Sequence, residues 1–254
     1  YLLSPADVVP DTQGTLGSAL GNVAVDTGTG AIDNRGGMIV AALDVSLKTQ
    51  GLNNTDATIA GRDVGIDTQR QLFDNSRGIL AAERALDVRS GALTNAGGLI
   101  QAGGMASFAT TTFDNTAGFI GAQGPLDIAA SALGNAGGLI RSRNAVHLAA
   151  DSVDNRNTQG VEQGIEGLSV SIDARRIDNT SGAMRADETL ILTGSGPATG
   201  SGPAWLDNSG GLISSAQTIA IKDAGATRTL AIVTNAGTLI ADQRLEIDSA
   251  SLGG

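Results

Sequence analysis

The sequence contains no cysteine and few aromatic residues, and both absences limit how the chain can be stabilised. Disulfide bonds are excluded throughout its 254 residues, so the chain is not a disulfide scaffold. Phe, Tyr and Trp together make up 2% of the residues, whereas a globular core of this size normally uses more of them. Stability must therefore come from the architecture and from packed aliphatic side chains.

Lysine and long apolar runs are also scarce. Only Lys48 and Lys222 are lysines among 16 basic residues, and the formal net charge is −10. No basic stripe interleaved with aromatic residues occurs, so we expect no binding to nucleic acid. The apolar runs are far shorter than the ~20 residues of a membrane span. The sequence starts at Tyr1 without a signal peptide and ends inside a repeat, which we interpret as a piece of a longer protein.

What the sequence does contain is one short pattern in ten copies. In the segment 93–102 (LTNAGGLIQA) it is an apolar residue, a small or acidic residue, Asn, two variable residues, Gly, two apolar residues, a polar residue and Ala. The repeated asparagines are Asn34, Asn54, Asn75, Asn95, Asn115, Asn135, Asn155, Asn179, Asn208 and Asn235. Their spacings are 20, 21, 20, 20, 20, 20, 24, 29 and 27 residues. A period of this size is typical of a solenoid.

Each repeat contains three short apolar segments. One follows the glycine, as at 99–102 (LIQA), and a second lies about six residues later, as at 126–129 (LDIA). A third apolar residue stands two positions before each asparagine. Alternation with period two indicates strands, and no helical run is present to support a leucine-rich repeat. The pattern therefore predicts an all-β parallel β-helix (β-solenoid) of about 11 coils of ~20 residues.

The conserved positions of the pattern have structural interpretations. A glycine after the asparagine suits a corner where φ is positive. Asparagine side chains stacked from coil to coil can form an amide ladder. The position before the asparagine reads Asp33, Asn53, Asp74, Thr94 and Asp114, so aspartate recurs on every other coil. Because like charges on adjacent strands repel, this alternation favours in-register stacking, and it argues against a calcium ladder.

The regularity of the pattern divides the chain into three parts. Residues 1–22 are an irregular start or a partial coil, and residues 23–156 form regular coils. Residues 157–254 form coils with predicted loop insertions at 157–167, 194–204 and 222–229. Such insertions are either neutral surface loops or part of a binding face.

The sequence offers little that could carry catalysis. His147 is the only histidine and is expected to face outward, without other ligands at metal-binding spacing. Carboxylates are spread along the chain, and the only basic clusters are Arg141 with Arg143 and Arg175 with Arg176. We therefore expect no enzyme, metal or cofactor. A β-helical polysaccharide-degrading enzyme is a less favoured alternative. A cluster of Asp, Arg and an aromatic platform in the folded chain would support it.

The repeat resembles that of filamentous haemagglutinin, and residues 126–140 (LDIAASALGNAGGLI) are a close match. That family comprises exoproteins of Gram-negative two-partner secretion systems, including haemagglutinin-like adhesins and effectors of contact-dependent growth inhibition. The resemblance covers about residues 23–252. It implies a right-handed β-helix, a secreted or cell-surface location, and an outer-membrane transporter as partner of the parent protein.

Two further hypotheses about function follow from this resemblance. The first is a rigid extracellular shaft segment that projects a distal functional element of a virulence-related adhesin or inhibition protein. The alternative is a module that binds a target-cell receptor or glycan through the inserted loops, with Trp205, Arg175 and Arg176 as candidate contacts. In both cases we expect a monomer.

Overall fold

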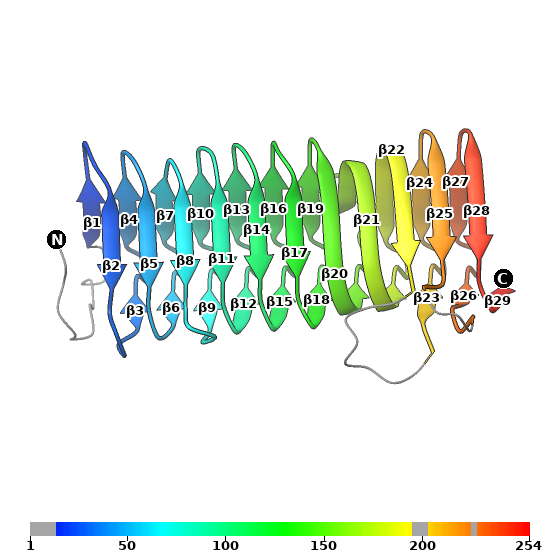
Figure 1. Ribbon diagram of the computed structural model, residues 1–254, viewed down its shortest axis with the longest axis horizontal. Coiled ribbons are helices and arrows are strands. Elements are labelled where there is room, and N and C mark those ends of the chain that lie inside the picture. The colour runs from blue at the N-terminus through cyan, green and yellow to red at the C-terminus, as the bar shows by residue number, and fades with distance from the viewer. Residues whose placement is uncertain (1–13, 195–202, 225–227) are drawn as a thin grey trace. The chain divides into compact units, whose positions relative to one another are not determined.

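A computed structural model describes residues 14–194, 203–224 and 228–254, which form 29 β-strands and no helix. Contacts divide the chain into two compact units, Tyr1–Gly124 and Pro125–Gly254. In both units the strands pair in parallel with strands one coil away, where a coil is one revolution of the chain (Figure 1). The predicted parallel β-solenoid of about 11 coils is therefore confirmed.

Each coil of the first unit has three sides, and equivalent sides stack in register. The first side contains β1 (Thr15–Ser18), β4 (Met38–Ala41), β7 (Thr58–Gly61), β10 (Ile79–Ala82), β13 (Leu99–Ala102) and β16 (Phe119–Ala122). The second contains β2 (Val23–Asp26), β5 (Val45–Lys48), β8 (Val64–Asp67), β11 (Leu86–Arg89) and β14 (Ala106–Ala109). The third contains β3 (Ile32–Asp33), β6 (Leu52–Asn53), β9 (Phe73–Asp74), β12 (Ala92–Thr94) and β15 (Thr112–Asp114).

The second unit has the same three sides, but several strands run through a corner without a break. Strand β20 (Ala145–Asp154) joins the second and third sides, β21 (Gly164–Asp178) joins all three, and β22 (Ala183–Thr193) joins the first two. The remaining strands are β17 (Leu126–Ala129), β18 (Ala132–Gly134), β19 (Leu139–Ser142), β23 (Trp205–Asp207), β24 (Leu212–Ser215), β25 (Thr218–Lys222), β26 (Ala231–Val233), β27 (Thr238–Ala241), β28 (Arg244–Asp248) and β29 (Ser251–Gly253).

The core consists of columns of aliphatic side chains that point inward from each side. Along β5, Val45 and Leu47 are buried while the residues between and after them are exposed, as the period of a strand requires. On the first side of the first unit, the inward column consists of Ile39, Ile59, Leu80, Ile100 and Ile120, each 0 or 1% exposed. Full burial of one such side chain contributes roughly 1.5–3 kcal/mol.

Phe73, Phe108 and Phe113 of the first unit belong to these columns, whereas Phe119 lies on an outward row and is half-buried. Phe73, Leu93 and Phe113 pair in register on the third side, so large and smaller side chains alternate there. Phe113 also contacts Phe108 of the second side, with ring centroids 5.2 Å apart. Stacked aliphatic side chains and the rings of Phe73, Phe108 and Phe113 therefore fill the interior of the first unit. This explains how a chain with so few aromatic residues builds a core.

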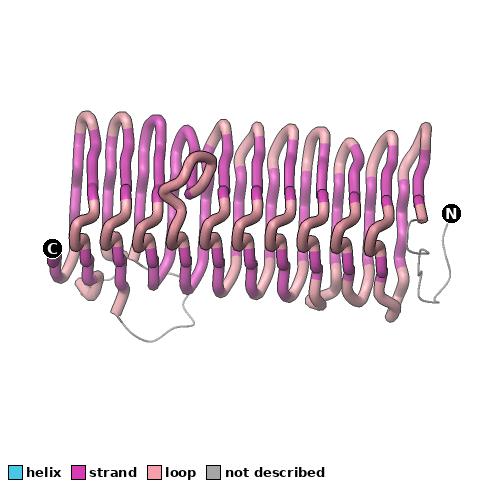
Figure 2. The backbone as a smooth tube through the Cα atoms, turned by 180° about the vertical axis from the view of Figure 1, so that it is seen from behind, coloured by secondary structure: helices cyan, strands magenta, loops and turns pink. Residues whose placement is uncertain are grey.

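The segments outside the strands coincide only in part with the predicted insertions. After β20 the described chain forms a loop that ends at Gln163, because β21 begins at Gly164, inside the range 157–167. Figure 2 shows this loop and the shorter turns that recur at the same corner of each coil. Residues 195–202 of the range 194–204, residues 225–227 of the range 222–229, and residues 1–13 of the range 1–22 lie outside the described residues. Within the last range, residues 15–18 form β1.

Candidate functional site

The asparagine column forms a chain of side-chain amide hydrogen bonds within each unit. In the first unit Nδ2 of Asn34, Asn54, Asn75 and Asn95 donates to Oδ1 of the asparagine one coil later, over 2.7, 2.7, 2.7 and 2.8 Å. In the second unit Asn135, Asn155 and Asn179 donate in the same way to Asn155, Asn179 and Asn208, over 2.8, 2.7 and 2.7 Å. All these asparagines are 0 or 1% exposed. Apart from Oδ1 of Asn34, which is buried without a hydrogen-bond partner among the described residues, the amide groups in these two series bond to neighbouring coils, which makes the column structural.

The last asparagine of the series differs from the others. Asn235 is exposed, and no hydrogen bond joins its amide to Asn208 within the described chain. The Nδ2 of Asn208 instead donates to the backbone oxygens of Gly211 and Thr238, at 3.3 and 3.1 Å. The described ladder of the second unit therefore runs from Asn135 to Asn208.

The glycine of the repeat is required by close packing between coils and not by a positive φ. A Cβ atom built at Gly98 would lie 2.3 Å from the backbone oxygen of Asn75, one coil earlier, and Gly78 and Gly118 are equally close to their predecessors. The positive φ falls one residue before this glycine, at Gly97 (61°) and Ala117 (52°). The sequence interpretation was therefore wrong about the backbone role of this glycine.

An Asp or Asn that precedes a repeat asparagine accepts a backbone hydrogen bond through its side chain. Oδ1 of Asp74 accepts the N–H of Ser76 at 2.9 Å, and Oδ1 of Asp114 accepts that of Thr116 at 2.9 Å. Asn53 does the same for Thr55 at 3.0 Å, so an uncharged side chain serves equally well. These are Asx turns, which fix the corner that follows the third side.

Aspartates do not alternate in the second unit, where an arginine offsets the repulsion between two of them. Asp154, Asp178 and Asp207 stack on three successive coils. Arg156 lies 2.7 Å from Asp154 and 3.6 Å from Asp178, between the two carboxylates. Burial raises the pKa of Asp154, but the hydrogen bonds from the guanidinium and the backbone N–H of Arg156 outweigh it and leave that pKa lowered. Regular alternation is thus one of two ways in which this column limits repulsion.

The three candidate binding residues of the sequence analysis separate into two environments. Arg175 makes a bidentate ion pair with Asp151 at 2.8 and 2.7 Å, and its side chain is only 18% exposed. Arg176 is exposed and stands in register with Trp205, which is half-buried. Arg176 and Trp205 therefore share one outward row, while Arg175 is engaged at the corner next to it.

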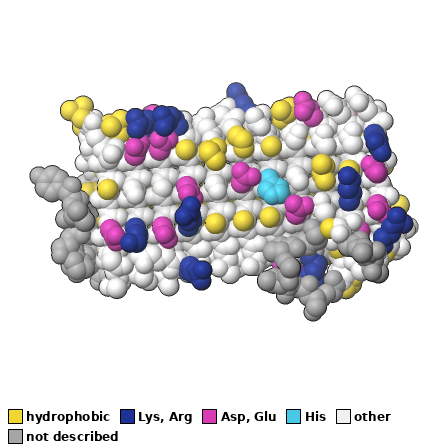
Figure 3. Space-filling model, viewed as in Figure 1, with side chains coloured by type: hydrophobic (Ala, Val, Ile, Leu, Met, Phe, Trp, Pro, Cys, Tyr) yellow, Lys and Arg dark blue, Asp and Glu magenta, His cyan; other side chains and the backbone are white. Residues whose placement is uncertain are grey.

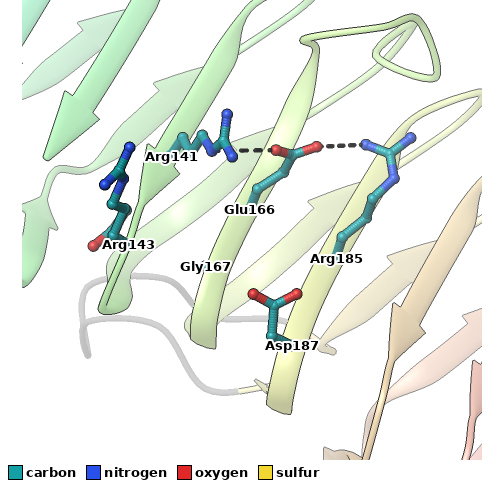
Figure 4. A pocket seen from close by; sticks show the side chains of 7 residues that line it. Arg141, Arg143, Glu166, Gly167, Arg185 and Asp187 are labelled. Atoms are coloured by element: carbon teal, nitrogen blue, oxygen red, sulfur yellow. Dashed lines mark hydrogen bonds and ion pairs between the residues drawn. The ribbon is translucent and has the colours of Figure 1, made fainter. Parts of the chain in front are cut away.

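The second unit also has a polar cleft of about 390 Å³ that the sequence analysis did not assemble. Its lining residues are Arg141, Ser142, Arg143, Glu166, Gly167, Arg185 and Asp187. Arg141, Glu166 and Arg185 form one outward row, since Arg141 pairs with Glu166 and Glu166 with Arg185 in the strand register. Figure 4 shows both guanidinium groups directed at the Glu166 carboxylate, with Arg143 and Asp187 on opposite sides of Gly167.

The carboxylate of Glu166 lies between two arginines. Its Oε1 accepts from Arg185 at 3.0 Å, and its Oε2 lies 3.8 Å from Arg141. Arg185 also donates to the backbone oxygen of Gln163 at 3.1 Å. Both carboxylate oxygens of Glu166 therefore face the guanidinium groups of the two flanking arginines. None of the described residues that line the cleft is aromatic.

Charge elsewhere is mixed. On the face shown in Figure 3, basic and acidic side chains lie beside one another in small groups. His147 is on β20 between Asp127 and Ser171 in the register, with a half-exposed side chain. No group of three or more His, Cys, Asp or Glu side chains that could hold a metal ion occurs among the described residues. The same residues include no helix of the length and hydropathy needed to cross a membrane.

Comparison with known proteins supports the repeat assignment over part of the chain. The sequence profile of one protein family, the haemagglutinin repeat, matches residues 13–76 and 61–116. No curated protein and no solved structure matches the chain. Proteins with this repeat are typically secreted or surface adhesins, and the family is a structural type that is not an enzyme class.

Proposed function

Because residues 13–116 consist of haemagglutinin repeats of the filamentous type, we propose that the chain is a rigid extracellular shaft segment of a large secreted adhesin or contact-dependent inhibition protein. The shaft projects a distal functional element of the parent protein from the surface of a Gram-negative bacterium. An outer-membrane transporter of a two-partner secretion system exports the parent.

The buried amide ladder is the observation that carries this proposal. In the first unit it links five successive coils through bonds of 2.7 or 2.8 Å, and the inward aliphatic columns follow the same register. A coil cannot tilt or slide against its neighbour without breaking these buried bonds, each of which would leave unsatisfied polar groups. Such stacking suits a part whose task is mechanical.

Paired spin labels can test the stiffness, because the chain has no native cysteine. Ala24 and Ser107 occupy one outward column of the second side, four coils apart through Ser46, Gly65 and Asp87. Double electron–electron resonance on labelled Ala24→Cys/Ser107→Cys should give a narrow distribution centred near the four-coil separation of ~19 Å, allowing for the label arms. A broad distribution in the folded chain would contradict a rigid shaft.

A second candidate function is contact with a target-cell receptor or glycan through Arg176 and Trp205. It is supported by their adjacent register and by the exposure of Arg176. Arg175 is not part of this candidate surface, since Asp151 already engages it. Binding of the labelled chain to epithelial and Gram-negative cells, compared with Trp205→Ala and with the exposed control Leu72→Ala, tests this idea. Equal binding by all three proteins would remove Trp205 from any recognition surface.

A further inference from the structure

The cleft on the second unit contains an arginine and an aspartate that have no side-chain partner among the described residues. Eleven of the fourteen arginines form ion pairs with carboxylates of the described chain. Arg143 is one of the three that do not, the others being Arg70 and Arg176. Asp187 likewise forms no ion pair or side-chain hydrogen bond within the described residues. Both groups are therefore available to a ligand in the same cleft.

The backbone keeps these two groups apart and the space between them open. Gly167 and Ser169 pair with Ala186 and Thr189, so Asp187 and Glu188 together oppose the single residue Leu168. This is a β-bulge, a feature that re-aims side chains. A Cβ atom at Gly167 would lie 2.8 Å from the backbone oxygen of Ser169 and 3.2 Å from that of Asn144. A side chain there would not fit without movement of the backbone, so the floor of the cleft stays bare.

The charges of the cleft favour an anionic ligand. Three arginines and two carboxylates line it, which leaves one positive charge in a chain whose net charge is −10. Glu166 forms ion pairs with Arg141 and Arg185. Arg143 is therefore the arginine of the cleft without an ion pair among the described residues. A planar guanidinium recognises a carboxylate through paired hydrogen bonds. Asp187 can only accept, so the same ligand must present hydroxyl donors to it.

An acidic sugar meets both requirements. A hexuronic acid residue has a ring carboxylate and neighbouring hydroxyl groups, and a cleft of about 390 Å³ can accommodate one or two sugar rings. Neutral sugars would offer Arg143 only uncharged hydroxyl acceptors, and the described lining residues include no aromatic ring on which such sugars could stack. We propose that this cleft binds a hexuronate residue of an acidic polysaccharide, with Arg143 binding the carboxylate and Asp187 accepting the hydroxyl groups.

Isothermal titration of the full chain with trigalacturonate tests the proposal. We expect saturable binding that is lost with the trimethyl ester of the same trisaccharide. Arg143→Gln should weaken binding at least about tenfold, the effect of losing one hydrogen-bonded charge. Arg70→Gln is the matched control, because Arg70 is also exposed and unpaired but lies in the first unit; it should bind like the parent. Asp187→Asn should weaken binding less than Arg143→Gln does.

Circular dichroism and the urea midpoint of each variant establish that it is folded before titration. Both Arg143 and Asp187 are exposed, so their substitution should leave the midpoint unchanged. Three results would overturn the proposal: no saturable binding by the parent chain, equal binding of the methyl ester, or unchanged binding by folded Arg143→Gln. Equal binding of a sulfated trisaccharide of the same charge would also overturn it, since the site would then recognise charge and not a uronate.

Discussion

A single asparagine in the ladder is connected to several coils at once. Nδ2 of Asn95 donates to Oδ1 of Asn115 and to the backbone oxygens of Gly98 and Phe119, while its own Oδ1 accepts from Asn75. Asn75, Asn95 and Asn115 are each 0% exposed to solvent. Removing such a side chain leaves buried groups on both neighbouring coils without partners, and that penalty exceeds the net value of any one hydrogen bond.

We therefore expect Asn95→Ala to lower the free energy of unfolding by at least about 2 kcal/mol, from two stranded groups at about 1–3 kcal/mol each. Asn235→Ala is the control at the same repeat position, because Asn235 is exposed. It should change the free energy by no more than about 0.5 kcal/mol. Urea titration followed by circular dichroism measures both. Similar losses for the two variants would mean that the ladder bonds do not matter.

The adjacent glycines Gly97 and Gly98 separate two backbone requirements. Gly97 adopts φ of 61°, a conformation that alanine can take at a cost of roughly 1–2 kcal/mol, and Ala117 does so in the next coil. Gly98 has no room for a Cβ atom, because Asn75 O would lie 2.3 Å away. We expect Gly98→Ala to destabilise the chain more than Gly97→Ala in the same urea assay. The reverse order would show that the positive φ is the stricter requirement.

At the scale of strands, an ion pair joins the continuous elements β20 and β21 at the corner between their second and third sides. Asp151 and Arg175 face each other there, with side chains 25 and 18% exposed and two hydrogen bonds between them. The Arg175 guanidinium holds the pKa of Asp151 below its usual range. Exclusion from solvent and the bidentate geometry should make this pair stronger than an ordinary surface pair.

A double-mutant cycle with Asp151→Asn and Arg175→Gln should yield a coupling energy of about 1 kcal/mol. The matched pair is Asp87 with Arg89, whose side chains are 53 and 68% exposed and 3.3 Å apart. Its coupling should be close to zero, because solvent screens it. Thermal or urea unfolding of the seven proteins, the shared parent and three variants for each pair, provides both values. Equal coupling in the two cycles would contradict a special role for the corner pair.

The strands and their register could be predicted because both follow from the repeat itself. Alternation with period two marks the strands, and a constant spacing of 20 or 21 residues between asparagines up to Asn155 dictates which residues stack. The close approach at Gly98 could not be predicted, because it depends on the distance between two coils and not on local conformation.

The polar cleft could not be predicted for a different reason. Arg141, Glu166 and Arg185 are 25 and 19 residues apart, so no constant period relates them. Their alignment depends on the loop before Gly164, and Asp187 stands in a β-bulge that follows this row; the repeat specifies neither feature. The signal that was present is the pair Arg141 and Arg143 at the end of one strand. This pair indicated one edge of the cleft, but the sequence did not indicate that Glu166, Arg185 and Asp187 line it as well.

At the scale of the whole molecule, each coil depends on the neighbours on both of its sides. Leu190 and Leu206 are 0% exposed, whereas Leu245 and Leu252, which continue the same inward columns in the last coil, are 45 and 57% exposed. Stability in such an array is approximately a sum of interfaces between neighbouring coils. Electrostatic terms that recur from coil to coil therefore accumulate in the stability of the chain.

The recurring carboxylates should make the free energy of unfolding fall at acidic pH. Hydrogen bonds from Arg35, Arg77 and Arg175 hold the pKa values of Asp33, Asp56 and Asp151 below the ordinary 3.8. A carboxyl group with a lowered pKa in the folded state stabilises the fold above its unfolded pKa, and that contribution is lost as pH falls through the folded pKa. Self-repulsion of the acidic chain acts in the opposite direction, but it vanishes near the isoelectric point of about 4.4.

We therefore expect the urea midpoint to stay level or rise slightly from pH 7 to about 4.5 and then to fall steadily below pH 3.8. Measurement at 0.15 M salt limits the contribution of long-range repulsion, because charges more than about 8 Å apart are then largely screened. Asp151→Asn should start from a lower midpoint at pH 5 and lose less of it on acidification, since the titrating group is gone. Equal midpoints at pH 5 and pH 2.5 in the parent chain would show that the arginine–aspartate pairs contribute nothing to folding. The pair of Asp151 and Arg175 would then not stabilise the corner between β20 and β21.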